Sequence, residues 1–106
     1  MTPEQALHKH TGYPLDEIVQ LNETTWECGS EEWLVLTDEE ADALQDEYLE
    51  SYLDDCIYPQ LPELARSYFD EEAWKRDAKY DGRGHFLASY DGEEIEEMDL
   101  FMYRIN

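Results

Sequence analysis

Basic residues are scarce in this 106-residue chain: seven lysines and arginines stand against 28 aspartates and glutamates, which leaves a formal net charge of −21. A charge of this sign disfavours direct binding to nucleic acid. Cysteine is scarce too, and Cys28 and Cys56 form no CxxC pattern, so we expect two reduced thiols and no disulfide framework. Because no apolar run reaches about 18 residues and no basic-then-apolar leader occurs, the sequence predicts a cytoplasmic protein without a membrane span.

What the chain does contain is the material for a hydrophobic core. Hydrophobic residues make up 42% of it and aromatic residues 13%, whereas acidic disordered chains are poor in both. Solubility needs a net charge of only about 2 to 8 in a small domain. Since self-repulsion at −21 weakens the compact state, we expect residues 1–106 to form a single acidic α+β domain whose charge serves a function.

Capping residues and apolar periodicity predict one long helix and several short ones. Thr37 to Glu40 is a capping sequence, and the helix that it begins is expected to run to about Ile57, before Pro59. Ala41, Leu44 and later apolar residues recur at three- and four-residue spacing and give this helix one apolar stripe. Shorter helical segments are expected at 3–10, 15–20, 62–69 and 70–80.

Two segments of β-branched and aromatic residues predict an antiparallel sheet. The first strand pair is expected at 24–28 and 33–36, around a turn at Gly29-Ser30. The second is expected at 86–90 and 100–105, separated by a turn at Asp91-Gly92 and a charged loop over 93–99. The predicted architecture is a small antiparallel sheet, packed on one face against the long acidic helix and its shorter companions.

Acidic residues are concentrated on the long predicted helix, which carries nine acids over 18 positions and no basic residue. At about 1.5 Å rise per residue this is one negative charge per ~3 Å, close to the one phosphate per ~3.4 Å of a DNA strand. A second acidic run surrounds the predicted C-terminal turn. The predicted phosphate-mimicking surface, which would bind a basic partner, comprises Asp38, Glu39, Asp42, Asp46, Glu47, Glu50, Asp54, Asp55, Glu93, Glu94, Glu96 and Glu97.

Four of these acids follow one another at helical spacing and are expected to lead the interaction, namely Asp42, Asp46, Glu50 and Asp54. Neutralising them is expected to abolish partner binding and to leave folding intact or improved. By contrast, five of the seven basic residues fall in the window 66–83, so the sign of the charge varies along the chain.

The segment Ser-Tyr-Phe-Asp-Glu-Glu-Ala-Trp-Lys-Arg-Asp at 67–77 resembles the Tyr-Phe-Asp-x-Glu-Ala-aromatic-x-Arg-Asp stretch of the ArdA family of antirestriction proteins. The C-terminal part, from Asp81-Gly82 to Tyr103-Arg104, is also similar to small proteins of bacteriophages. The resemblance implies an acidic mimic of B-form DNA, encoded by a phage or mobile element, that occupies a type I restriction enzyme in the host bacterial cytoplasm. The motif covers about a tenth of the chain.

Alternative partners fit the same charge. A CRISPR effector must also bind duplex DNA through basic residues that recognise the motif beside its target, so its DNA-binding groove is an equal candidate. An acidic interaction module could instead bind another basic DNA-binding protein with no anti-defence role. Adaptation to a salty cytoplasm is a third interpretation, and it predicts unfolding at low ionic strength. A homodimer is compatible with mimicry, because doubling the domain would lengthen the acidic surface.

No motif for catalysis or metal binding emerges. Neither cysteine lies in a known nucleophile signature with His8, His10 or His85. An EF-hand-like spacing that begins at Asp77 fails, because Lys79 and Ala88 occupy ligand positions. We therefore predict no enzyme activity, no catalytic residue, no cofactor and no metal site.

Overall fold

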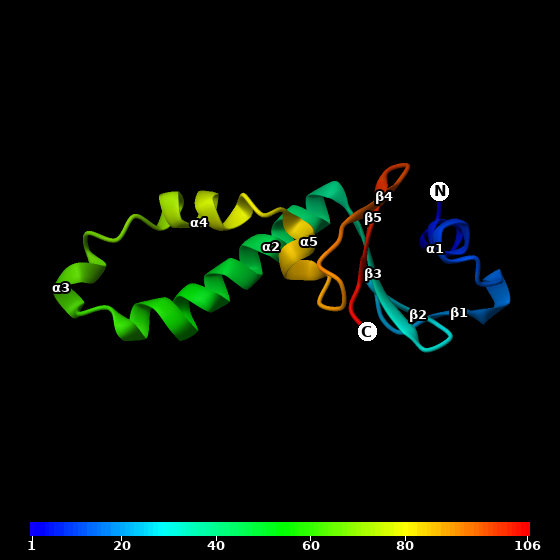
Figure 1. Cartoon of the computed structure of the whole chain (residues 1–106), viewed down its shortest axis with the longest axis horizontal. Helices are drawn as coiled ribbons and strands as arrows, with labels where there is room; N and C mark the ends of the chain where they lie inside the picture. Colours follow the sequence, from blue (N-terminus) through cyan, green and yellow to red (C-terminus); the bar gives the residue numbers. More distant parts are fainter.

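The computed structural model describes residues 1 to 106, and its centre is a five-stranded antiparallel sheet with the strand order β1-β2-β3-β5-β4 (Figure 1). The strands are β1 (Ile18–Gln20), β2 (Thr25–Cys28), β3 (Glu31–Thr37), β4 (Ile95–Glu97) and β5 (Leu100–Arg104). The long strand β3 is central and pairs with β2 on one side and β5 on the other. The predicted α+β class is confirmed.

The N-terminal half of the sheet follows the expected hairpin, with one addition. Strands β2 and β3 pair around Gly29 and place Trp26 opposite Trp33. The helical segment expected at 15–20 is only a 3₁₀ turn, η1 (Leu15–Glu17), and it leads directly into β1. The prediction of helix was wrong there because Ile18 and Val19 are β-branched and find an open sheet edge at β2.

The C-terminal prediction was wrong in its first strand. Residues 86–90 do not form a strand; the chain makes the short helix α5 (Arg83–Leu87) instead. The partner of β5 is β4, which lies inside the predicted charged loop, and the turn between them has Met98 at φ 58°. A short apolar run fits a strand or a buried helical turn equally well, so periodicity alone could not choose between them.

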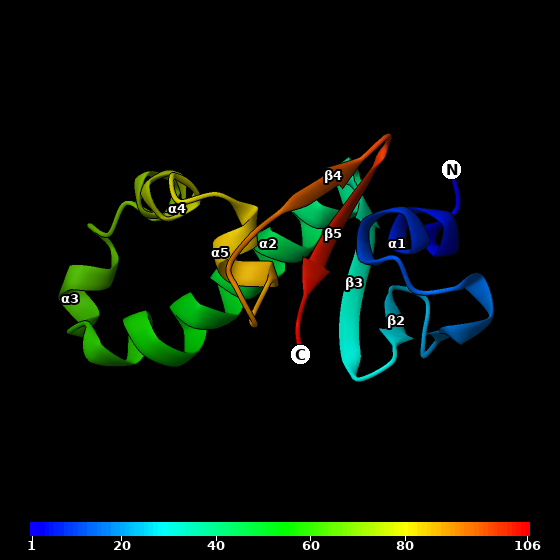
Figure 2. The same ribbon diagram turned by 45° about the vertical axis from the view of Figure 1, so that its right-hand side comes forward.

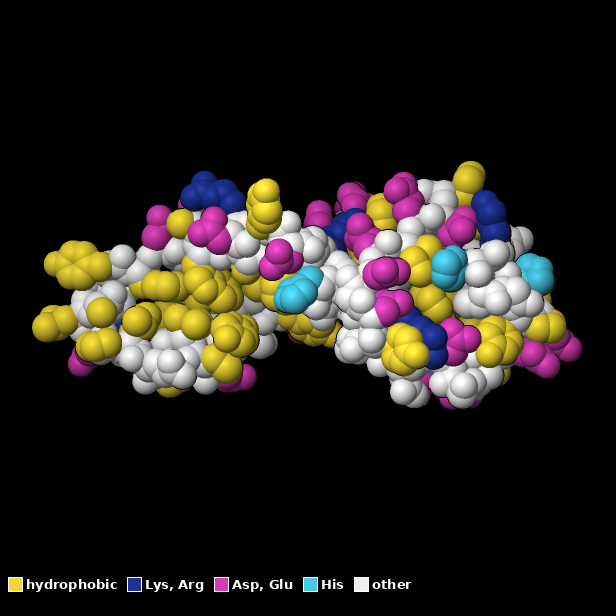
Figure 3. Space-filling model, viewed as in Figure 1, with side chains coloured by type: hydrophobic (Ala, Val, Ile, Leu, Met, Phe, Trp, Pro, Cys, Tyr) yellow, Lys and Arg dark blue, Asp and Glu magenta, His cyan; other side chains and the backbone are white.

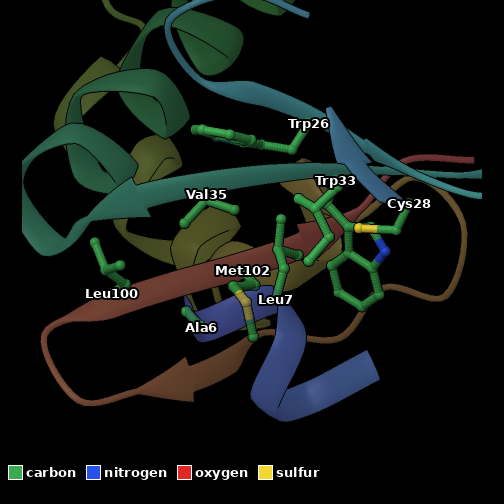
Figure 4. Close-up of a cluster of buried hydrophobic side chains, with 9 residues drawn as sticks. Ala6, Leu7, Trp26, Cys28, Trp33, Val35, Leu100 and Met102 are labelled. Atoms are coloured by element: carbon green, nitrogen blue, oxygen red, sulfur yellow. The ribbon is translucent and has the colours of Figure 1, made fainter. Parts of the chain in front are cut away.

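One face of the sheet is covered by helix α1 (Pro3–Thr11). The Thr2 hydroxyl accepts from the amide of Gln5 and the Gln5 side chain accepts from the amide of Thr2, so the helix starts with a complete capping box. Its buried residues Ala6 and Leu7 pack against the sheet, among the side chains of Trp26, Cys28, Trp33, Val35, Leu100 and Met102 (Figure 4).

The opposite face is covered by α5 and by the start of the long helix α2 (Asp38–Tyr52). Ala41 and Leu87 pack there against Leu36 and Tyr103. Helices therefore cover both faces, whereas the sequence placed them all on one. The reason lies in β3, where the four consecutive residues Trp33–Leu36 are all buried, so each face of this strand needs a cover.

Beyond the sheet, α2 continues into a projecting helical arm, which we define as residues 46–82 (Figures 1 and 2). The chain passes through η2 (Leu53–Ile57, π-helical) and η3 (Tyr58–Gln60), turns at α3 (Glu63–Arg66) and returns in α4 (Glu71–Lys79). The helix expected at 62–69 is thus only four residues long. The molecule measures 56 × 23 × 21 Å.

Crossing a bilayer requires a longer and more apolar helix than any that this structure contains.

Candidate acidic interaction surface

Arg83 connects three of the predicted surface acids. Its guanidinium lies 2.8 Å from the Asp38 carboxylate, 3.1 Å from that of Asp42 and 2.7 Å from that of Glu94. The side chain is 14% exposed and lies over the ring of Phe101, 4.6 Å from its centroid. Burial opposes the positive charge, but the hydrogen bonds to Asp38 and Glu94 outweigh it and raise the pKa of Arg83. These contacts join the start of α2 to the loop before β4.

The loop that carries Glu94 also has a second anchor. The Tyr103 hydroxyl donates a hydrogen bond to the Glu94 carboxylate. Burial and this hydrogen bond raise the pKa of Tyr103. At Gly84, a Cβ atom would come within 2.6 Å of the Glu94 backbone nitrogen and 2.7 Å of the Gly92 carbonyl oxygen. The absence of a side chain at Gly84 therefore allows the loop to lie directly on α5.

Two lysines of α4 hold the acids in the middle of α2. The Lys75 Nζ atom lies 2.6 Å from Glu50 and 3.2 Å from Glu71, and the Lys79 Nζ atom lies 2.5 Å from Asp46. The hydrogen bond to Glu50 is the main cause of the raised pKa of Lys75. Since Glu50 and Asp46 belong to one helix and the lysines to the other, these pairs fasten the two sides of the arm together.

The twelve predicted acids therefore divide into two groups of six. The paired group forms ion pairs within the chain and includes Glu97, whose carboxylate lies 3.2 Å from Lys9; its members are Asp38, Asp42, Asp46, Glu50, Glu94 and Glu97. The unpaired group forms none; its members are Glu39, Glu47, Asp54, Asp55, Glu93 and Glu96. That Asp42, Asp46 and Glu50 lead a partner interaction stays a prediction, and in this structure a basic side chain already lies beside each of these three carboxylates.

Spacing along α2 places the paired acids of this helix in one row. Asp38, Asp42, Asp46 and Glu50 recur every four residues and form the row that faces the basic side chains of α4 and α5. Glu39 and Glu47 lie on the same helix, three residues before Asp42 and Glu50 respectively; both are exposed and neither forms an ion pair. The basic cluster at 66–83 is visible in the sequence and indicates that some acids are paired. The sequence does not indicate which acids pair with it.

A further acidic region lies on the sheet. Glu27 and Glu32 are directly opposite each other on β2 and β3 and form no ion pair, whereas neighbouring Glu31 lies 3.4 Å from Arg104. Like charges in directly opposite positions destabilise a sheet. Over the whole chain, eight of the 28 acids are in ion pairs, and these occupy five of the seven basic residues. The remaining 20 acids keep their charge uncompensated.

Two of the three histidines and one of the two cysteines have packing or hydrogen-bonding roles in the fold. The ring of His8 bonds to the Tyr13 carbonyl oxygen at 2.6 Å, and the ring of His10 packs edge-on against Trp33. Burial, helped by Glu31 and Glu27, raises the pKa of the Cys28 thiol to about 11, which keeps it protonated at neutral pH. No group of three or more His, Cys, Asp or Glu side chains is arranged to hold a metal ion.

The segment 67–77, on which the ArdA resemblance rests, forms the entry into α4. Asp70 caps this helix by accepting from the amide of Ala73 at 3.1 Å. Trp74 stacks on Tyr52, and Lys75 pairs with Glu50. In this structure the segment therefore holds the two sides of the arm together. Comparison of the chain with family models, with curated proteins and with solved structures gives no match.

Proposed function

We propose that this protein is an inhibitor, encoded by a phage or mobile element, that occupies the DNA-binding groove of a bacterial defence complex by mimicking duplex DNA. The supporting observation is the density of charge on a long, folded body. A net charge of −21 over a length of 56 Å is one negative charge per about 2.7 Å, against one per ~1.7 Å of duplex axis. The defence complex is a type I restriction enzyme, to which the ArdA resemblance points, or a CRISPR effector.

The unpaired group supplies the phosphate-like charges. Glu39, Glu47, Asp54 and Asp55 are exposed along α2 and η2, and Glu93 and Glu96 are exposed just before and within β4. A DNA-binding protein gains much of its affinity by releasing counterions from phosphates, and fixed carboxylates can offer the same exchange without being a substrate. Because a helix already orders these carboxylates, little further ordering is needed on binding.

The internal ion pairs favour this function in a second way. Free lysines and arginines would repel the basic groove of a DNA-binding protein. Arg83, Lys75 and Lys79 are instead each bound to carboxylates of α2, so their charges are offset where they stand. The arm thus keeps its shape without presenting an unpaired lysine to a partner, and its two arginines without an ion pair are Arg66 and Arg76.

The test is a displacement experiment. The tagged protein is incubated with lysates of bacteria that carry type I restriction and CRISPR systems, washed, and eluted with short duplex DNA. We expect a DNA-targeting effector in the eluate, with an affinity that falls steeply as salt rises. Recovery of another basic protein that duplex does not displace would favour the acidic interaction module instead.

Two matched variants then locate the surface. The unpaired variant carries Glu39→Gln, Glu47→Gln, Asp54→Asn and Asp55→Asn, and the paired variant carries Asp38→Asn, Asp42→Asn, Asp46→Asn and Glu50→Gln. Both change four acids of the same helical segment and both reduce the net charge to −17. We expect the unpaired variant to lose far more affinity for the recovered effector. Equal losses would show that only total charge matters and would reject this surface.

A further inference from the structure

A small hollow, which we call the α2 hollow, lies between the sheet and α2. Its volume is about 230 Å³, and it is lined by Thr24, Leu36, Glu40, Ala43, Leu44 and Glu47. Pockets that bind small molecules measure about 300 to 1,000 Å³. The α2 hollow is smaller than these, so it has room for one side chain of a partner protein rather than for a complete small molecule.

Helical spacing places the α2 hollow on one side of the helix. Four of its residues occupy positions i, i+3, i+4 and i+7, which share one side of an α-helix, namely Glu40, Ala43, Leu44 and Glu47. Glu40 and Leu44 are offset by two residues from the ion-paired row at 38–50. At about 3.6 residues per turn, the two rows are about 200° apart around the helix axis. The α2 hollow and the ion pairs with α4 and α5 therefore lie on opposite sides of α2.

The α2 hollow combines apolar and negatively charged groups. Leu36 is 2% exposed and Leu44 is half-buried, whereas Glu40 and Glu47 are exposed. One oxygen of Glu40 accepts from the amide of Thr37, and neither carboxylate forms an ion pair within the chain. A long basic side chain matches this lining, because its stem is apolar and its head is charged. Arginine matches it best, since its head carries five N–H donors in a fork and can serve two carboxylates.

The charge around the α2 hollow favours a basic occupant. The basic side chains at the sheet end of the molecule, Lys9, Arg83 and Arg104, are each paired with acids elsewhere, and none lines the hollow (Figure 3). Side chains alternate along a strand, so Glu32 and its cross-strand neighbour Glu27 lie on the face of the sheet that adjoins the hollow. Both are unpaired. The negative potential there is therefore left uncompensated by the chain itself.

The opposite side of α2 shows what carboxylates of this helix attract. Asp46 and Glu50 are met there by Lys79 and Lys75 of α4, at 2.5 and 2.6 Å. Glu40 and Glu47 have no such helix facing them. We propose that the α2 hollow receives an arginine side chain of the partner, with the stem on the apolar residues and the guanidinium donating to the two carboxylates. This inference rests on the proposed function, because the arginine belongs to the DNA-binding groove of the inhibited complex, where it would otherwise contact a phosphate.

The first test needs no partner. Ala43→Arg places a guanidinium of the chain itself in the hollow, four residues before Glu47, and Ala43→Gln adds a long side chain without the charge. Gln60→Arg adds the same charge at an exposed residue that does not line the hollow. In thermal melts, we expect Ala43→Arg to melt about 2 to 4 °C above Ala43→Gln, and Gln60→Arg to melt within about 1 °C of the wild type. A gain at residue 43 no larger than the gain at residue 60 would reflect reduced repulsion alone and would overturn the inference.

The second test uses the full chain and the effector recovered by duplex displacement. We expect Ala43→Arg to weaken binding by at least about tenfold, because its own arginine fills the hollow, and Gln60→Arg to weaken binding by less than about threefold. Equal weakening by these two variants would overturn the inference and leave the proposed function in place. Equal weakening by Ala43→Gln and Ala43→Arg would assign the hollow to an uncharged occupant. If duplex displaces no effector from the wild type, the proposed function is rejected, and with it the arginine of the partner.

The two tests separate the two proposals. The melting temperatures show whether the hollow accepts a basic side chain, and they do so whether or not an effector is recovered. The affinities show whether a partner supplies that side chain.

Discussion

The Arg83 Nε atom donates to the Glu94 carboxylate at 2.7 Å, and the same carboxylate accepts from the Tyr103 hydroxyl. This contact joins α5 to the loop before β4, and the Arg83 Nη1 atom donates to the carboxylates of Asp38 and Asp42 on α2. The largest acidic helix and the C-terminal acidic run are therefore held together through one cation. The negative surface consequently has a fixed shape.

Replacing Arg83 with glutamine is expected to lower the free energy of unfolding by about 2 to 3 kcal/mol, since charged hydrogen bonds are lost and three carboxylates remain close together. Urea denaturation measures the change. Arg76→Gln is the control, because it removes the same charge from an exposed arginine that forms no ion pair, and it should change stability by less than about 0.5 kcal/mol. Similar losses in both variants would show that Arg83 acts only through net charge.

Replacing Gly84 with alanine is expected to displace the loop that carries Glu94. The added Cβ would meet backbone atoms of residues 92 and 94 at 2.6–2.7 Å, and backbone cannot swing aside as a side-chain end can. Overpacking of this kind costs about 1 to 3 kcal/mol. Thermal unfolding measures the loss, and His85→Ala, an exposed change in the same helix, is the comparison. An unchanged melting temperature in Gly84→Ala would mean that the loop does not need this close approach.

The start of α2 could be predicted from sequence because its determinants are local. Thr37 and Glu40 exchange hydrogen bonds at 3.0 and 3.2 Å, and the pattern that produces them spans four residues. The β2–β3 hairpin was equally local. The pairing of the acids was not, because Arg83 lies 41 and 45 residues beyond Asp42 and Asp38 in the chain. Only the folded path of α2 and α5 brings them together, so helical spacing identified the row and not its partners.

Two of the failures of the predicted fold, the strand at 86–90 and the single covered face of the sheet, have a similar origin. The apolar run at 86–90 carries no local feature that distinguishes a strand from a buried turn, and the sheet position beside β5 is taken by β4. Likewise, helices must pack on both faces of the sheet because β3 is its central strand. Strand propensity does not predict which strand is central. Local propensity predicted which segments form regular secondary structure. Long-range pairing decided whether a segment became a strand or a helix and where it lies in the fold.

Stability is expected to fall in alkaline solution. Burial and the bond to Glu94 raise the pKa of Tyr103 from an ordinary value of 10.0, so above about pH 10 the unfolded chain releases this proton and the folded chain does not. Each pH unit in that window costs about 1.4 kcal/mol for such a group. The contribution is complete below pH 10 and is lost as pH rises.

Urea denaturation at about pH 8 and about pH 11 measures this loss. The buried thiol of Cys28 acts in the same direction, starting near pH 9, so the wild type should lose stability over the whole range. Tyr103→Phe should lose less between the two pH values than the wild type does. Tyr80→Phe, at a tyrosine that is 92% exposed, should behave as the wild type. If Tyr103→Phe and the wild type had the same pH dependence, the Tyr103 hydroxyl would not remain protonated in the fold.

The paired and unpaired variants of α2 are also expected to differ in stability. If all acids on this helix were alike, the two variants would be equally stable. Both remove four charges, so both relieve the same overall repulsion of a chain at −21. The paired variant additionally breaks the contacts of Arg83, Lys75 and Lys79 with α2. Exposed ion pairs contribute about 0.2 to 1 kcal/mol each, so we expect the paired variant to be about 1 to 3 kcal/mol less stable than the unpaired one.

Thermal melts in dilute buffer and in about 0.5 M salt measure this difference, because salt screens both the repulsion and the exposed pairs. In dilute buffer the wild type should remain folded, and the unpaired variant should melt above it. The difference between the two variants should shrink as salt is added. A wild type that unfolds in dilute buffer would favour adaptation to high salt over mimicry. Equal melting temperatures for the two variants would mean that the ion pairs of α2 add nothing to stability, and the acids of Asp38, Asp42, Asp46 and Glu50 would then be as free to meet a partner as those of the unpaired group.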